Sequence, residues 1–369
     1  MKIVIFVSTP AQAHFFKNII RTLEKKGHDV KTLARNYGET LYLLKTFNIS
    51  HFVFADTFRS KYGKIFLLPY HIFSAYRYLR KFDIDLIVGT GLYSEYASFL
   101  LRRPNIIFMD AVSTKTELHL IKGFTSAILS PSNLTTEIGE KHIKINSFKE
   151  LSYLHPRYFG PDKNTLNLIG MGERDNFAVV RFNAFDAIHD VGVRGFSPKD
   201  RRKLINELSQ HGKILISSET SVPEDLEEYV LKIPKEKIHD VLYYAKILIA
   251  DTGTMVTEAA LLGTPAILYH PKAKTIGNFI ELEQKYNLIY TFDRSQGLVE
   301  KALSLFTQRD LKKEWEEKRE RVIKEKIVGP APARSRPGRK RLFPWDPGCG
   351  GRPPSPGPCR CLWDSGTRR

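Results

Sequence analysis

The first 328 residues contain no cysteine, because the three cysteines of the 369-residue chain (Cys349, Cys359 and Cys361) all lie near its end. Disulfide bonds and thiol catalysis are therefore excluded for residues 1–328. No stretch approaches the roughly 20 consecutive apolar residues that a membrane-spanning helix needs. The apolar run at 3–7 is too short for a signal peptide, so we expect a buried first strand and a cytoplasmic protein.

The last 41 residues differ in composition from the rest. They contain nine prolines and seven glycines, but no isoleucine, valine or glutamate. So few apolar side chains cannot offset the entropy lost on ordering, and we expect 329–369 to be disordered. A nucleic-acid-binding tail and a metal site are alternatives, although three thiols without a histidine make a poor zinc site. We interpret the tail as the product of a shifted reading frame or a cloning artefact.

Acidic residues are scarce relative to basic ones, and the formal net charge is +17. The last 41 residues contribute +7 of this, with eight arginines and one lysine against two aspartates. The remaining +10 is a moderate excess. No nucleic-acid-binding motif accompanies it, so we expect no nucleic-acid partner.

Strand and helix patterns alternate through the rest of the chain, at 2–7, 13–26, 28–34, 39–47, 49–55, 64–82, 85–88, 93–101, 105–109 and 126–129. The alternation loosens through 151–176 and restarts at 177–181, 198–210, 213–217, 235–244, 247–250, 255–262, 265–269 and 276–285. Such alternation predicts an α/β protein with parallel, doubly wound sheets. We expect two Rossmann-like domains, 1–160 and 161–328, with a ligand cleft between them beyond the carboxyl ends of the strands.

One motif joins the apolar strand 247–250, through an Asp-Thr-Gly-Thr turn, to a helix that ends at Gly263. Gly253 allows the backbone to approach a ligand, and Thr252 and Thr254 offer hydroxyl groups. The helix N-terminus adds N–H groups that favour a phosphate or pyrophosphate. The motif therefore predicts an anion site.

Glu258 lies one turn into this helix. One interpretation is that Thr254 caps the helix and Glu258 only favours its dipole. A capping box needs an acid three residues after the cap, and position 257 is threonine. We therefore predict that the Glu258 carboxylate is free to bind two hydroxyl groups of a ribose, with helix capping alone as the alternative.

These motifs carry a family resemblance. Two Rossmann-like domains with this strand, turn and Glu258 in the second resemble GT-B nucleotide-sugar glycosyltransferases and the non-hydrolysing UDP-GlcNAc 2-epimerases. Over roughly residues 1–327 the chain is more closely similar to the largely archaeal family called domain of unknown function 354. The motifs that carry this similarity are His14-Phe15-Phe16, Ala-Arg-Asn-Tyr-Gly-Glu-Thr at 34–40, Val-Val-Arg-Phe at 179–182, His189-Asp190, and the segments 253–255 and 263–265.

The resemblance implies a GT-B fold with an acceptor-side first domain and a donor-binding second domain. It implies a nucleotide sugar, UDP-linked, as substrate rather than a separate cofactor. By the same resemblance Thr252, Gly253 and Thr254 would contact the diphosphate, and Glu258 the ribose.

Three further candidates follow first-domain strands at the carboxyl end of the sheet. His14 is placed where a general base would face the cleft, although a structural role at a helix start is the alternative. Glu95 and Asp110 are candidate acceptor-side acids. The segment 85–91 lacks the acid that the epimerases carry at that strand end, so the epimerase is less favoured than the glycosyltransferase.

Second-domain candidates follow the strand at 177–180. Arg181 would neutralise a diphosphate leaving group, with an interdomain salt bridge as the alternative. Asn183, Asp186 and His189 in the loop after it form a polar set that could line the cleft.

The segment 58–81 interleaves aromatic and cationic residues. One interpretation is a peripheral contact with anionic lipid at the inner face of the membrane. The alternative, which we favour, is an ordinary crossover helix with its aromatic residues on the sheet.

The favoured function is transfer of a sugar from a nucleotide donor to an acceptor. We expect a lipid-linked or cell-surface glycan as the acceptor, although the sequence does not identify it. We expect no metal, because no Asp-x-Asp lies near the donor motif. An epimerase or hydrolase acting on a nucleotide sugar and a non-catalytic nucleotide-sugar-binding protein are the alternatives.

Overall fold

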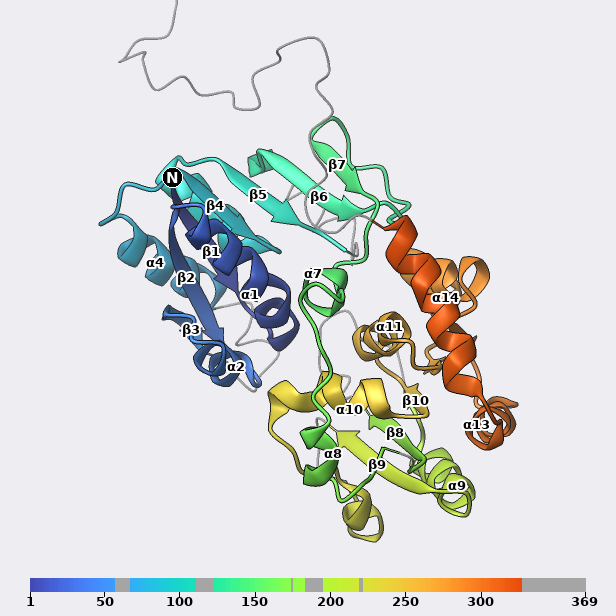
Figure 1. Cartoon of the computed structure of the whole chain (residues 1–369). Coiled ribbons are helices and arrows are strands. Elements are labelled where there is room, and N and C mark those ends of the chain that lie inside the picture. The colour runs from blue at the N-terminus through green and yellow to red at the C-terminus, as the bar shows by residue number, and fades with distance from the viewer. Residues whose placement is uncertain (57–66, 111–122, 174, 183–194, 219–221, 327–369) are drawn as a thin grey trace, which may run out of the picture. The chain divides into compact units, whose positions relative to one another are not determined.

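A computed structural model gives the fold of the chain (Figure 1). It describes residues 1–56, 67–110, 123–173, 175–182, 195–218 and 222–326, all of which belong to one compact unit. The predicted tail, 329–369, lies outside the described residues. None of the described helices is long and apolar enough to cross a membrane.

The first sheet has seven parallel strands in the order β3-β2-β1-β4-β5-β6-β7. The inner strand β1 is buried from Ile3 to Val7, as expected for a parallel sheet covered on both faces. The strand order reverses between β1 and β4, and ligands bind at such switch points. The strands are β1 (Lys2–Val7), β2 (Asp29–Asn36), β3 (His51–Asp56), β4 (Leu86–Gly89), β5 (Asn105–Phe108), β6 (Ala127–Pro131) and β7 (His142–Ile145).

The second sheet has five parallel strands in the order β12-β11-β10-β8-β9. Its switch point lies between β8 and β10, and all four residues of β10 are buried. The strands are β8 (Phe177–Phe182), β9 (Lys213–Ser218), β10 (Ile247–Ala250), β11 (Ala266–Tyr269) and β12 (Ile289–Phe292).

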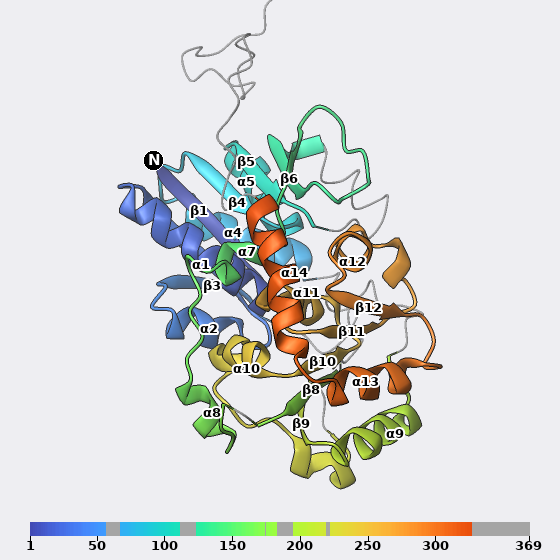
Figure 2. The same ribbon diagram turned by 45° about the vertical axis from the view of Figure 1, so that its right-hand side comes forward.

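Helices connect and cover the strands of both sheets (Figures 1 and 2). Those before β8 are α1 (Pro10–Lys25), α2 (Thr40–Thr46), α4 (Leu68–Leu79), α5 (Leu92–Leu101), α7 (Leu151–Leu154) and α8 (Asn164–Leu168). Those after β8 are α9 (Pro198–Ser209), α10 (Ile238–Tyr244), α11 (Gly253–Leu262), α12 (Gly277–Ile280), α13 (Leu298–Thr307) and α14 (Leu311–Glu325). A π-helical turn, Glu281–Lys285, continues α12, and 3-10 turns occupy Glu224–Tyr229, Lys235–Lys237 and Ala273–Thr275.

The start of α1 is fixed by its sequence. Thr9 is extended and its hydroxyl accepts a hydrogen bond from the Gln12 N–H at 3.3 Å, while Pro10 takes the first helical position. Further along, the Asn18 amide donates to the Ser152 carbonyl at 2.8 Å. The helix is therefore tied to α7, which lies in the stretch between the two sheets.

The end of α14 returns to the first sheet. The buried Trp315 indole donates to the Leu288 carbonyl at 2.8 Å and holds the helix on the second half. At its end, the Asn146 amide donates to the Glu325 carbonyl at 3.2 Å, and Lys326 Nζ donates to Asn146 Oδ1 at 3.0 Å. Because Asn146 directly follows β7, these bonds join the two halves of the fold.

The sequence prediction of two parallel, doubly wound sheets is confirmed. Two details differ. The helix expected from residue 255 begins at Gly253, and the strands β7 and β12 were not predicted. The predicted boundary at residue 160 falls between the sheets and stays a prediction.

Candidate functional site

The Glu258 carboxylate lies in the second turn of α11 and is only 6% exposed. Its Oε1 accepts a hydrogen bond from the Tyr153 hydroxyl at 2.7 Å and lies 3.0 Å from His239 Nε2. The prediction of a free carboxylate is therefore wrong for this oxygen. The partners come from α7 and α10, which sequence spacing alone could not bring to α11.

The turn before α11 is built by close packing. Asp251 is buried and accepts a hydrogen bond from the Phe196 N–H at 3.3 Å. Thr252 is the N-cap in an extended conformation, and its side chain makes no capping bond, so the interpretation of Thr254 as the cap is wrong. A Cβ on Gly253 would lie 2.3 Å from the Phe279 ring, so glycine is required here by a protein neighbour.

The N-terminal turn of α11 still has the properties of an anion site. Thr252, Gly253 and Thr254 are all partly exposed, whereas the next turn is buried. The turn directly follows β10, at the switch point of the second sheet. The N–H groups and the dipole of the ten-residue helix both favour a phosphate there.

Aromatic rings enclose the Glu258 carboxylate. The buried His14 ring of α1 lies edge-on to the His239 ring at 4.6 Å and 5.5 Å from the Tyr153 ring. Lys17, one turn further along α1, lies over the Tyr153 ring at 5.9 Å. The structure therefore brings His14 and Glu258, predicted from opposite halves of the sequence, into one cluster.

Burial and charge set the protonation states in this cluster. Burial, with His239 and Lys17 nearby, holds the pKa of His14 well below its usual value, so its imidazole is neutral at pH 7. Burial would raise the pKa of Glu258, but His239, the Tyr153 hydroxyl and Lys149 together outweigh it and the net shift is downward. Burial lowers the pKa of Lys17 to about 8, although Glu258 and Asp240 oppose that shift.

Asp110 lies on the border of the same cluster. It follows β5, and its carboxylate is paired with the ammonium of Lys149. Lys149 Nζ also lies 3.7 Å from Glu150 Oε1, and both carboxylates raise the pKa of Lys149 against the opposing effect of burial. The electrostatic influence of Glu258 also reaches Lys149. Asp110 is therefore held as half of an ion pair.

The other two described candidates are engaged elsewhere. Glu95 is fully buried on α5 and accepts a hydrogen bond from the Thr125 hydroxyl at 2.5 Å. Arg181 lies within β8, not after it, and its guanidinium donates to the Ser217 hydroxyl at 2.8 Å. The roles of Glu95 and Arg181 stay predictions.

Three predicted cleft residues, Asn183, Asp186 and His189, lie outside the described residues. Within the described part of the chain, no group of three or more histidine, cysteine, aspartate or glutamate side chains could hold a metal ion.

Sequence analysis missed four members of the cluster: Lys149, Glu150, Tyr153 and His239. The first three lie in or next to the stretch where the strand and helix alternation loosens. His239 was inside a predicted helix, and the His-Asp pair 239–240 at its start was the one available signal.

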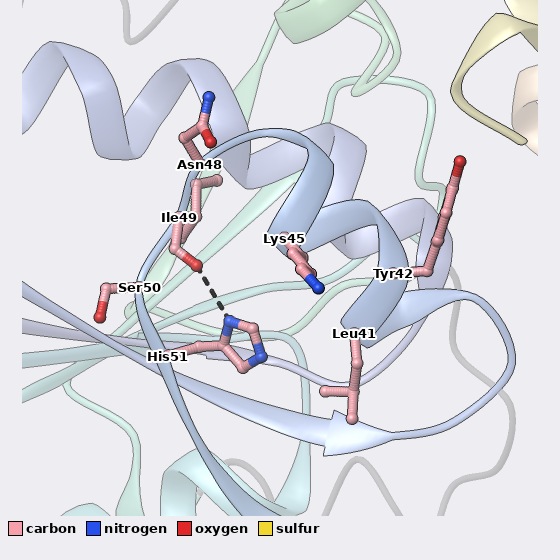
Figure 3. A pocket seen from close by; sticks show the side chains of 7 residues that line it. All are labelled: Leu41, Tyr42, Lys45, Asn48, Ile49, Ser50 and His51. Carbon is pink, nitrogen blue, oxygen red and sulfur yellow. Dashed lines mark hydrogen bonds between the residues drawn. The ribbon is translucent and has the colours of Figure 1, made fainter. Parts of the chain in front are cut away.

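A separate hollow of about 550 Å³ lies on the first half (Figure 3). It is lined by Leu41, Tyr42, Lys45, Asn48, Ile49, Ser50 and His51. The His51 ring points back to the Ile49 carbonyl, 2.9 Å from Nδ1. None of the predicted site residues lines this hollow, so it is not the predicted donor site.

Known proteins share this architecture. No family model matches the chain. An uncharacterized protein of Methanocaldococcus jannaschii is 23% identical over 297 residues, or 76% of this chain and 84% of that protein.

Two solved structures define the fold class. The UDP-GlcNAc 2-epimerase of Neisseria meningitidis, solved bound to UDP-GlcNAc, has a TM-score of 0.61 at 14% identity and covers 87% of this chain and 94% of its own. The glycosyltransferase of kitacinnamycin has a TM-score of 0.56 at 11% identity and covers 88% of this chain and 95% of its own. The chain therefore has the GT-B fold of glycosyltransferases and UDP-GlcNAc 2-epimerases.

Proposed function

We propose that the chain is an enzyme that uses a nucleotide sugar as donor and transfers the sugar to an acceptor hydroxyl. One observation carries the proposal. Glu258 and the partly exposed N-terminal turn of α11 lie at the switch point of the second sheet in a GT-B fold. Membership of the domain of unknown function 354 family, an archaeal source and a cytoplasmic location are parts of this proposal.

His14, the N-terminus of α11 and Arg181 would each take part in this reaction. The neutral His14 imidazole accepts the proton of the acceptor hydroxyl, whose oxygen forms the new bond to the anomeric carbon. The bond from that carbon to the diphosphate breaks, and the nucleoside diphosphate leaves toward the N-terminus of α11. Arg181 neutralises part of the negative charge that develops on the leaving group.

Thermal unfolding of the full chain with UDP, GDP, CDP and dTDP tests the donor site. A nucleotide at 100 times its dissociation constant stabilises a protein by about 2.7 kcal/mol, a rise in Tm of roughly 3–5 °C for a chain of this size. We expect one nucleotide to give this rise, and Glu258→Gln to remove most of it. Glu300→Gln, an exposed carboxylate on α13, is the matched control and should keep the full rise.

If no nucleotide raises Tm, the proposed function is wrong. If Glu258→Gln responds as the wild type does, the nucleotide binds away from α11. If a nucleotide binds, release of that nucleotide from its sugar conjugate is then measured with and without an acceptor. Glycosyl transfer needs the acceptor, whereas hydrolysis does not.

A UDP-GlcNAc 2-epimerase-like enzyme or a hydrolase is the second candidate. The observation that favours it is the group of carboxylates, Asp110 and Glu150, close to Glu258, since epimerisation needs acid and base groups at the sugar. This candidate predicts turnover of the nucleotide sugar without acceptor. Nucleotide binding without any product would instead indicate a binding protein.

We also propose a peripheral membrane contact for the first half. In α4, His71, Ile72, Ala75 and Leu79 are buried, while Tyr70 and Phe73 are 66% and 56% exposed. Phe99 and Leu100 of α5 are exposed as well, and Arg80 and Arg103 lie beside Leu100. Residues 57–66 of the predicted segment lie outside the described residues. Sedimentation with phosphatidylglycerol vesicles but not phosphatidylcholine vesicles is expected, and equal recovery with both would contradict the contact.

A further inference from the structure

Within the part of the chain that the structure describes, the hydrogen bonds to the Glu258 carboxylate reach one of its two oxygens. Both the Tyr153 hydroxyl and His239 Nε2 bond to Oε1, at 2.7 and 3.0 Å. A carboxylate oxygen has two lone pairs, so these two donors fill the acceptor positions of Oε1. The second oxygen, Oε2, is thereby left to face another partner.

The donors are themselves fixed in place. Tyr153 and His239 are 1% and 3% exposed, and their ring centroids lie 5.4 Å apart. The His14 ring packs against both of them. The short helix α7 contacts both α1 and α11, so the Tyr153 hydroxyl reaches Glu258 from outside the second sheet. A side chain with three rotatable bonds is therefore confined to one orientation.

We propose that Tyr153 and His239 are positioning residues that hold Glu258 so that Oε2 accepts the ribose hydroxyl groups of the donor. In this arrangement they set the preference for a ribonucleotide over a 2′-deoxyribonucleotide. The inference rests on the proposed function, because it assumes that the nucleotide binds at α11.

The preference has a physical cause. A buried carboxylate that is aimed at a hydroxyl group loses a charge-assisted hydrogen bond when the substrate lacks that group. Sites built to bind a hydroxyl group discriminate strongly against the analogue without it. A carboxylate that can turn away, because one of its donors is missing, loses part of this discrimination. His239 also lowers the pKa of Glu258, which keeps the acceptor ionised near neutral pH.

Calorimetric titration of the full chain with UDP and with 2′-deoxy-UDP tests the inference, with the GDP and CDP pairs in parallel. We expect the wild type to bind the ribonucleotide at least about tenfold more tightly than its deoxy form. Tyr153→Phe keeps the ring but removes the hydroxyl, and should reduce this ratio by about threefold or more. The deoxy form should be weakened less than the ribonucleotide, because only its 3′-hydroxyl bonds to Oε2. His239→Leu should do the same, and His239→Gln, which keeps an N–H donor, should restore most of the ratio.

The exposed Tyr158, five residues beyond Tyr153, gives a matched control, because Tyr158→Phe should leave both affinities unchanged. If Tyr153→Phe and His239→Leu weaken both nucleotides equally, or neither, the two residues only pack and the inference is wrong. If the wild type binds a nucleotide but does not distinguish the sugars, the inference is wrong although the donor function stands. If the wild type binds no nucleotide, both are wrong.

Discussion

At the scale of single residues, the surroundings of Glu150 disfavour its negative charge. It is 1% exposed, and among the described residues its Oε2 has no hydrogen-bond partner. Burial raises the pKa of the Glu150 carboxyl to about 7, although Lys149 opposes the shift. Between the pKa of Glu150 in the unfolded chain and its higher pKa in the folded chain, the carboxyl is therefore protonated when folded and ionised when unfolded.

Stability should therefore fall as pH rises from about 4.5 to 7, since the folded state binds the extra proton in this range. Glu150→Gln removes the titration, and we expect its Tm to match that of the wild type at pH 4.5. At pH 8 the free energy of unfolding of Glu150→Gln should be about 1–3 kcal/mol larger than that of the wild type. Scanning calorimetry across this range measures the difference.

Glu300→Gln is the control for this series, because an exposed carboxylate should show no pH-dependent difference from the wild type. If the stabilities of Glu150→Gln and the wild type change in parallel from pH 4.5 to 8, the pKa of Glu150 is the same in the folded and unfolded chains and the prediction is wrong.

At the scale of elements, α11 shows how a ligand motif also serves packing. Its N-terminal turn is closed by the Phe279 ring against Gly253, and its C-terminus is ended by Gly263 with φ of 78°. Gly253→Ala places a methyl group 2.3 Å from that ring and should destabilise the chain by about 1–3 kcal/mol.

Phe279→Leu should recover part of this loss when combined with Gly253→Ala, because the smaller side chain leaves room for the methyl group. A double-mutant cycle in urea measures the coupling. Gly160→Ala, where a methyl group meets open space, should be close to neutral. If Gly253→Ala and Phe279→Leu lower the free energy of unfolding additively, the Phe279 ring does not set the requirement for glycine at position 253.

Sequence patterns were sufficient to predict α11 and the strand β10 before it, but not to predict the side chains that contact Glu258. The apolar run of β10 and the glycine at 263 predicted the element, because both properties are local. The contacts of Glu258 with Tyr153 and His239 span 105 and 19 residues. No local pattern carries such a pairing, so the carboxylate was predicted to be free.

At the scale of the whole molecule, the two halves are joined by contacts that were likewise beyond sequence analysis. The Asn133 carbonyl would lie 1.9 Å from a Cβ on Gly277, and the Asn133 amide donates to Glu281 at 2.9 Å. The nearly buried Lys326 completes this group with a 2.6 Å bond to Glu281. Alternation of strands and helices predicted both sheets, but the way in which they meet depends on side chains such as these.

These junctions place His14 of the first half beside His239 and Glu258 of the second. We propose that this cluster and the N-terminus of α11 together hold a nucleotide. A direct test must therefore locate the bound nucleotide as well as measure its affinity.

Diffraction from crystals of the full chain grown with the nucleoside diphosphate that raises Tm most is the direct test. We expect the diphosphate at Thr252–Thr254 and a ribose hydroxyl within hydrogen-bond distance of Glu258 Oε2. A nucleotide bound elsewhere, with Glu258 still enclosed by Tyr153 and His239 and touching no ligand, would contradict it.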